Sequence, residues 1–130
     1  MTVLIADDDR VQTLMLASRL KAKGFKVTVA YDAIQAWIAA IQTLPDVIIL
    51  DIQMPGGTGI AVLTQLKAST KTNQIPVIVL SGSIDPQIVP RVKDLGADEF
   101  LTKPVNLDAL YLALSRLLGI APQAPPLGSG

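Results

Sequence analysis

Three aspartates in a row, Asp7, Asp8 and Asp9, directly follow the apolar run from Val3 to Ala6. That run has the length and composition of a buried strand, so three like charges gather at a strand end and repel one another. A divalent cation bound between them reverses the sign of that interaction, because a bound metal is often the largest local charge in a site. The triplet therefore indicates a metal site.

Three further apolar runs also end in side chains that can do chemistry. Asp51 ends the run that begins at Val47, Ser81 ends the run that begins at Val77, and Lys103 follows a third run. Oxygen-only ligands suit a hard cation, and Mg²⁺ takes one or two carboxylates together with waters and phosphate oxygens. Mg²⁺ and Lys103 would supply positive charge to a phosphoryl group, and Ser81 would donate a hydrogen bond to it. Asp51 is a nucleophile able to form an aspartyl phosphate.

Strands and helices are expected to alternate along the whole chain. We predict strands at about residues 2–6, 26–30, 46–51, 76–81 and 98–102, and helices at about residues 10–22, 33–44, 58–69, 87–95 and 106–118. This alternation indicates βαβ units and a parallel sheet, and Val/Ile-rich middle strands indicate that both faces are covered. The fold class is α/β: a flavodoxin-like, doubly wound, five-stranded parallel sheet of order 2-1-3-4-5 with helices on both faces.

In such a sheet, ligands bind beyond the carboxyl ends of the strands, where the strand order reverses. Here that point lies between the first and third strands. Asp7 and Asp8 would lie beside Asp51 there, with Ser81 and Lys103 at the adjoining strand ends.

Two of the predicted helices carry an apolar stripe that we expect to face the core. The stripe of the second helix consists of Ile34, Trp37, Ile38, Ile41 and Leu44, and that of the fifth consists of Leu107, Leu110, Tyr111, Leu114, Leu117 and Leu118. Residues at these spacings share one face of a helix. The tryptophan is therefore interpreted as a core residue rather than a platform for a ligand.

Local signals place the ends of two helices. Asp9 with Gln12 three residues later has the pattern of a capping box for the first helix. Pro86 stands at the start of the fourth helix and Pro90 inside it, where a proline removes a hydrogen bond and clashes with the preceding turn. We therefore expect that helix to start late, with Pro90 in its first turn and residues 83–89 as loose or 3₁₀-like chain.

Composition narrows the function classes. With 130 residues, half of them hydrophobic, the chain is expected to form one domain over residues 1–118 and a Pro/Gly-rich linker or disordered tail over residues 119–130. A formal net charge of zero argues against nucleic-acid contact. The absence of Cys and His excludes disulfides, thiol catalysis and a Ser-His-Asp triad. Without a transmembrane-length apolar stretch or a cleavage signal, no membrane contact and a cytoplasmic location are expected.

The chain resembles the receiver domain of two-component response regulators, the family typified by the chemotaxis regulator. The resemblance covers residues 2 to about 118, essentially the whole domain. It rests on four segments: Val3 to Asp9, Pro45 to Gly56 with Gly59, Pro76 to Gly82, and Gly96 to Pro104.

This resemblance implies a role for each residue at the acidic site. Asp51 would accept a phosphoryl group from a histidine on a sensor kinase or a histidine phosphotransfer protein. Asp8 would bind Mg²⁺ directly, Asp7 would act mainly through water, and Asp51 and the backbone carbonyl of Gln53 would complete the ligands, with Mn²⁺ as an alternative ion. Lys103 would contact the acidic site when it is empty and the phosphoryl group when it is modified.

The resemblance also implies a conformational switch. The new phosphoryl oxygens would recruit the Ser81 hydroxyl, and Phe100 would turn inward, changing the surface of the fourth helix, fifth strand and fifth helix. The peptide between Lys103 and Pro104 is expected to be cis. Gln53 and Ser83 occupy positions that tune the lifetime of the phosphoryl group.

Two other function classes explain less of the sequence. A haloacid-dehalogenase-like phosphatase also uses a nucleophilic Asp, but it requires a second Asp two residues later, where this chain has Gln53. A nucleotide-binding flavodoxin-like protein would need a Gly-rich or hydroxyl-rich loop after the first strand, where this chain has the Asp triplet. On the receiver reading, the output can be a downstream protein, a fused effector domain or a phosphorylation-dependent homodimer.

Overall fold

The computed structural model describes residues 1–54, 59–82 and 86–120, in which five parallel strands alternate with five helices. The strands are β1 (Thr2–Ala6), β2 (Lys26–Ala30), β3 (Val47–Asp51), β4 (Val77–Ser81) and β5 (Glu99–Thr102). The helices are α1 (Arg10–Ala22), α2 (Ala33–Thr43), α3 (Gly59–Ala68), α4 (Ile88–Asp94) and α5 (Leu107–Leu118). Every predicted element is present, within one residue of its predicted ends.

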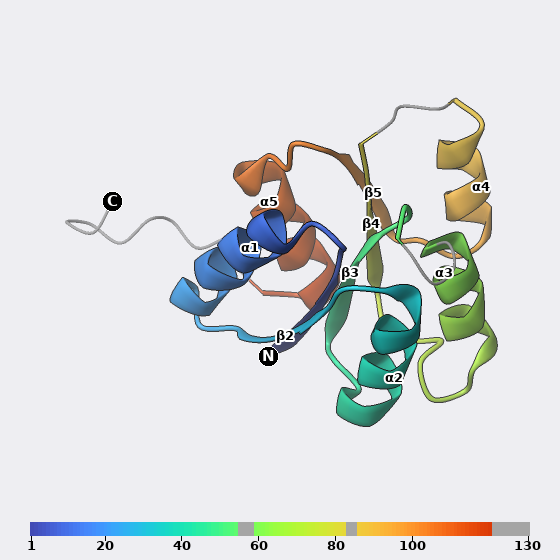
Figure 1. The fold of residues 1–130 in the computed structure, drawn as a ribbon, viewed down its shortest axis with the longest axis horizontal. Helices are drawn as coiled ribbons and strands as arrows, with labels where there is room; N and C mark the ends of the chain where they lie inside the picture. The colour runs from blue at the N-terminus through green and yellow to red at the C-terminus, as the bar shows by residue number, and fades with distance from the viewer. Residues whose placement is uncertain (55–58, 83–85, 121–130) are drawn as a thin grey trace.

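The strands pair in the order β2-β1-β3-β4-β5, which confirms the predicted topology. Helices α1 and α5 cover one face of the sheet, and α2, α3 and α4 cover the other (Figure 1). The central strands β1, β3 and β4 are almost wholly buried, because helices lie on both of their faces. This rigid layer is what fixes the positions of the residues at the strand ends.

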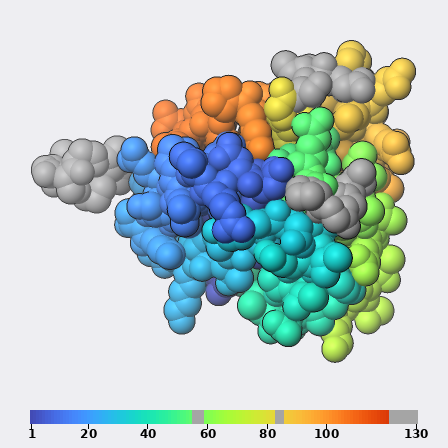
Figure 2. Space-filling view, in the orientation of Figure 1, coloured from blue at the N-terminus to red at the C-terminus, as the bar shows by residue number. Residues whose placement is uncertain are grey.

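The stripe predicted for α5 is confirmed, whereas the one predicted for α2 is wrong at three of its five positions. In α5, Leu110 and Leu114 are fully buried and the other members of the stripe pack against them. In α2, Ile34 and Ile38 are exposed, with relative exposures of 63% and 46%, and Leu44 beyond the helix is 52% exposed. The outer side of α2, in cyan and teal, forms part of the surface in Figure 2.

The buried face of α2 is made of alanines instead, namely Ala33, Ala36 and Ala40. These recur at i, i+3 and i+7, so they form a face as regular as the isoleucine stripe. Small side chains let the helix lie close to the sheet, and the partly buried Trp37 packs against the same core, as predicted for it. Hydrophobicity alone therefore selected the wrong face of this helix.

The start of α1 follows the prediction in part. Asp9 is the N-cap, and its Oδ1 accepts a hydrogen bond from the backbone N–H of Gln12 at 3.0 Å. The backbone N–H of Asp9, which a full capping box would satisfy with Gln12, instead donates to Asp7 Oδ1 at 2.9 Å. The capping residue thus also fixes the conformation of the segment from Asp7 to Asp9, called the acidic loop below.

Helix α4 begins at Ile88, so Pro90 lies in its first turn as predicted. Ile88 and Val89 are already helical, which corrects the expectation that residues 83–89 would be loose chain; residues 83–85 are outside the described part of the chain. A proline early in a helix is tolerated because the first N–H groups have no partner within the helix.

Gly59 allows α3 to begin directly against the end of β3. Its backbone N–H donates to the carbonyl of Ile52 at 2.9 Å. A Cβ at this position would lie far inside van der Waals contact with the carbonyl oxygen of Asp51 and with Cα of Ile52. Any side chain here would push α3 away from the backbone of Asp51 and Ile52.

We expect Gly59→Ala to lower the free energy of unfolding by about 2–3 kcal/mol, because the added methyl group meets backbone atoms that cannot rotate away. The matched control is Gly82→Ala, since a Cβ at Gly82 has no heavy atom within 4 Å. Urea unfolding of both variants tests this. Equal stabilities for the two would mean that the close approach of α3 to β3 is not required.

Candidate functional site

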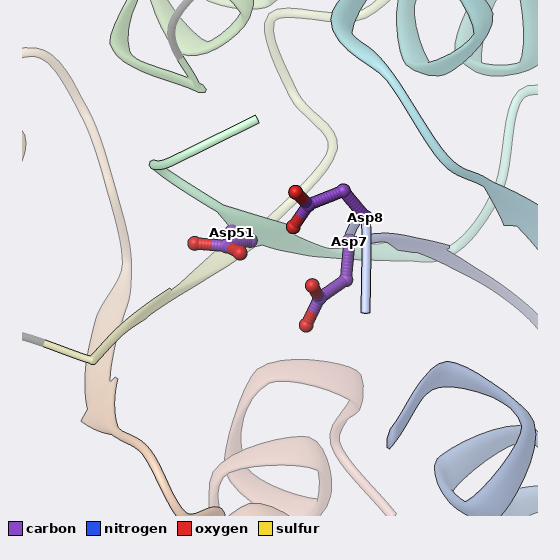
Figure 3. Close-up of side chains that lie close together, drawn as sticks. All are labelled: Asp7, Asp8 and Asp51. Atoms are coloured by element: carbon purple, nitrogen blue, oxygen red, sulfur yellow. The ribbon is translucent and has the colours of Figure 1, made fainter. Parts of the chain in front are cut away.

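The acidic site lies where β1 and β3 end side by side. Ala6 pairs with Leu50 in the parallel register, so Asp7 and Asp51 follow at the same height on neighbouring strands. Carboxylate oxygens of Asp7, Asp8 and Asp51 all lie within 4.8 Å of one another (Figure 3). Asp7 and Asp51 are buried and Asp8 is exposed. The three carboxylates therefore lie together, as predicted.

Lys103 reaches this acidic cluster from two strands away. Its backbone N–H donates to the carbonyl of Ser81 at 2.8 Å, which continues the pairing of β5 with β4. Its ammonium nitrogen lies 2.8 Å from Asp51 Oδ2 and 2.9 Å from Asp7 Oδ2. One cation is therefore shared by two buried carboxylates, and it lies across the end of β4.

The two buried aspartates use their oxygens in the same way. Asp7 Oδ1 accepts from the backbone N–H of Asp9, and Asp51 Oδ1 accepts from that of Gln53, each at 2.9 Å and each two residues onward. In both residues, the second oxygen faces Lys103. Each carboxylate is thus held by its own loop on one side and by the shared ammonium on the other.

Burial shifts the pKa of two groups in this cluster. Desolvation raises the pKa of Asp7 and the nearby charge of Asp51 adds to that rise, although the hydrogen bond from Asp9 and the ion pair with Lys103 oppose it. Desolvation alone would lower the pKa of Lys103, but its hydrogen bond to Asp51 and its ion pairs with Asp51 and Asp7 outweigh that effect and raise it. The lysine is therefore held in its charged form, whereas ionised Asp7 is disfavoured.

The donor set fits a hard divalent cation. Three carboxylates and one ammonium leave the cluster with a formal charge of −2, in a place where two of the acids have little access to water. All of the available ligand atoms are oxygens, which is the chemistry that Mg²⁺ requires. Asp7, Asp8 and Asp51 could hold such an ion, and the exposed Asp8 marks the side open to solvent.

The other predicted residues surround the cluster or lie behind it. Ser81 is buried at the end of β4, and the peptide between Lys103 and Pro104 is cis. Phe100 is partly buried and packs against the core under α2, α3 and α4, away from the carboxylates. Gln53 is exposed and contributes its backbone N–H to Asp51. Ser83 lies outside the described residues.

Sequence reasoning missed Thr13, a fully buried residue of α1. Its hydroxyl donates to the backbone carbonyl of Asp9 at 2.7 Å, beneath the acidic loop. The available signal was a polar residue on the helix face that otherwise carries Leu16, Ala17 and Leu20. A buried hydroxyl on such a face requires a partner, because leaving it unbonded is costly.

Comparisons with known proteins agree on one family. The family model described as "Response regulator receiver domain" matches residues 3–115. The transcriptional regulatory protein PrrA of Mycobacterium leprae is 39% identical over 118 residues, which cover 89% of this chain and 49% of that protein. The chain thus spans about half the length of this curated relative.

Solved structures give the same result. The signal receiver domain of a signal transduction histidine kinase from Syntrophus aciditrophicus has 34% identity and a TM-score of 0.83, covering 91% of this chain and 89% of that one. The chemotaxis protein CheY4 of Vibrio cholerae has 30% identity and a TM-score of 0.84, covering 90% of this chain and 98% of that one. Within the described residues, no helix combines the length and apolar character that crossing a membrane requires.

Replacing the buried acid by its amide should stabilise the metal-free protein. Because the pKa of Asp7 is raised on folding, the parent should lose stability as pH rises from the ordinary carboxyl range through the folded pKa, and stay less stable above it. Asp7→Asn has no such charge and leaves the pair between Asp51 and Lys103 intact. We expect a gain of about 1–2 kcal/mol at pH 7 in EDTA.

Urea unfolding between pH 4 and 8 measures this effect. Asp108→Asn, at an exposed acid in the first turn of α5, is the control and should lose about 0.5 kcal/mol or less. Adding Mg²⁺ should stabilise the parent more than Asp7→Asn. A metal-free Asp7→Asn variant that is less stable than the parent at pH 7 would contradict the assigned electrostatic cost.

Proposed function

Because the chain belongs to the response regulator receiver domain family, we propose that it accepts a phosphoryl group on Asp51 with the help of Mg²⁺. The donor would be a phosphohistidine on a sensor histidine kinase or a histidine phosphotransfer protein. The observation that carries the proposal is the shared ammonium: Lys103 pairs with Asp51 and Asp7 within a cluster of three carboxylates.

The position of Asp51 supports its role as the acceptor rather than Asp7. Asp51 ends β3, which lies between β1 and β4 in the sheet. It therefore has the acidic pair Asp7 and Asp8 on one side and Ser81 on the other. An acceptor in this position has groups for a metal on one side, and a hydroxyl and an ammonium on the other.

The transfer itself requires little from the protein beyond placement and charge. A carboxylate oxygen of Asp51 forms a bond to phosphorus while the bond from phosphorus to the histidine nitrogen breaks, and the electron pair of that bond returns to the imidazole. Mg²⁺, held by Asp7, Asp8 and Asp51, would supply positive charge to the phosphoryl oxygens. Lys103 would move from the carboxylates to the phosphoryl group, where its charge remains compensated.

The proposed output is a change of surface around β5. Phe100 lies on β5, two strands away from Asp51 in the sheet, and is only partly buried. Recruitment of the Ser81 hydroxyl by the phosphoryl group would let Phe100 turn inward and alter the surface of α4, β5 and α5. Gln53 and Ser83 would set how long the phosphoryl group lasts.

The proposed partner is the protein or domain that binds this altered surface. The curated relatives are longer than this chain, so the output can lie in a fused effector domain, a separate downstream protein or a homodimer. We propose a cytoplasmic location, because histidine kinases use ATP and ATP is found in the cytoplasm. We also propose that residues 1–118 form the receiver domain, with a linker from residue 119.

Asp51→Asn should abolish phosphorylation without unfolding the protein, because the amide is nearly isosteric but is not a nucleophile. Intact-mass spectrometry after incubation with acetyl phosphate and Mg²⁺ measures this directly. We expect one hydroxylamine-labile adduct on the parent, none on Asp51→Asn and none in EDTA. Asp108→Asn should be modified like the parent, and an adduct of parental yield on Asp51→Asn would rule out the assigned acceptor.

Lys103→Ala should keep Mg²⁺ binding but lose the conformational response. Without the ammonium, Asp7 and Asp51 face each other uncompensated, so the variant is compared with the parent in saturating Mg²⁺. Beryllofluoride, a mimic of the phosphoryl group, should shift the NMR signals of Phe100 in the parent and in the surface control Lys21→Ala, an exposed residue of α1. The same shift in Lys103→Ala would remove the lysine from the switch.

A further inference from the structure

The hydroxyl of Thr13 lies between two backbone carbonyls of the acidic loop. It is 2.7 Å from the carbonyl oxygen of Asp9, to which it donates, and 3.4 Å from that of Asp7. These two carbonyls belong to the residues on either side of Asp8. The side chain of Thr13 is fully buried, so water does not compete for these contacts.

Asp8 is the member of the acidic cluster with the least support of its own. Its side chain is exposed and makes no hydrogen bond with another residue in the described part of the chain, whereas Asp7 and Asp51 each accept one from their own loop. The direction of the Asp8 carboxylate therefore depends on the backbone at residues 7 and 9. That backbone is held by the N-cap bond of Asp9 and by Thr13.

Comparison with other hydroxyl residues shows what is special about Thr13. Thr43 and Thr64 also donate to the carbonyl four residues earlier, at 2.7 and 2.8 Å, but both are exposed, and their acceptors lie inside regular helix. Such bonds are common in helices and are of little consequence there. At Thr13 the acceptor is the capping residue itself, and the hydroxyl also approaches a residue outside the helix.

We propose that Thr13 is a positioning residue for the metal: its hydroxyl holds the backbone on both sides of Asp8 and thereby aims the Asp8 carboxylate at Asp51. This inference rests on the proposed function, since it concerns the same Mg²⁺ site. Groups that orient metal ligands without touching the metal typically change metal affinity tenfold or more when removed. Thr13 is not one of the residues proposed to hold the ion or to contact the phosphoryl group.

Thr13→Val replaces the hydroxyl by a methyl group of similar size. The methyl cannot remain 2.7 Å from the Asp9 carbonyl, so the loop must shift, while the backbone N–H of residue 13 can still donate to that carbonyl. The helix start therefore survives, and the change is confined to the acidic loop. Thr13→Ser keeps the hydroxyl and should behave like the parent.

The experiment compares four proteins: the parent, Thr13→Val, Thr13→Ser and the control Thr64→Val. We expect Thr13→Val to weaken Mg²⁺ binding about tenfold in a calorimetric or NMR titration, with the maximal phosphorylation rate restored at saturating Mg²⁺. In the metal-free protein, the Asp9 amide should exchange faster with solvent, because its hydrogen bond to Asp7 belongs to the same loop. Thr13→Ser and Thr64→Val should match the parent in both measurements.

The outcomes separate this inference from the function on which it rests. If the parent binds Mg²⁺ and Thr13→Val binds it with the same affinity, the positioning role is overturned and the receiver function still stands. A parent that binds no Mg²⁺ would overturn the proposed function and this inference with it. Thr13→Ala, which also lacks the hydroxyl but introduces no clash, provides the same test if Thr13→Val does not fold.

Discussion

One ammonium group holds together the part of this molecule where three strands end. Lys103 lies within 3 Å of oxygens from Asp7 and Asp51, and without it two buried carboxylates on adjacent strands would repel each other. The fold can place these acids side by side only because a cation arrives from β5 across the end of β4. Removal of the ammonium would leave two uncompensated charges in a buried place, which is usually strongly destabilising.

The same arrangement leaves the site with a net negative charge. The lysine compensates one of the three acids, and the remainder suits a divalent ion that would then compete with the ammonium for the same oxygens. Each buried aspartate has one oxygen fixed by its own loop and one oxygen facing the cation. The loop bonds would therefore preserve the geometry if a divalent ion took the place of the ammonium.

The strand–helix alternation and the convergence of Asp7, Asp51 and Lys103 could be predicted because they depend on local patterns. The apolar runs that end at these residues are the strands, and their order in the sheet brings the strand ends together. The face of α2 could not be predicted in this way, since alanine and isoleucine stripes share the same period and the choice depends on how closely the helix packs on the sheet. Nor could the role of Thr13, because a buried hydroxyl is informative only once its acceptor is known.

The inverted packing of α2 has a consequence for how this domain can diverge in sequence. Its alanine face leaves no room for larger side chains, so the residues that look least important there are the ones under the strictest steric limit. The exposed isoleucines Ile34 and Ile38 support no core, and polar residues could replace them at little cost in folding. Along this helix, tolerance to mutation therefore runs opposite to hydrophobicity.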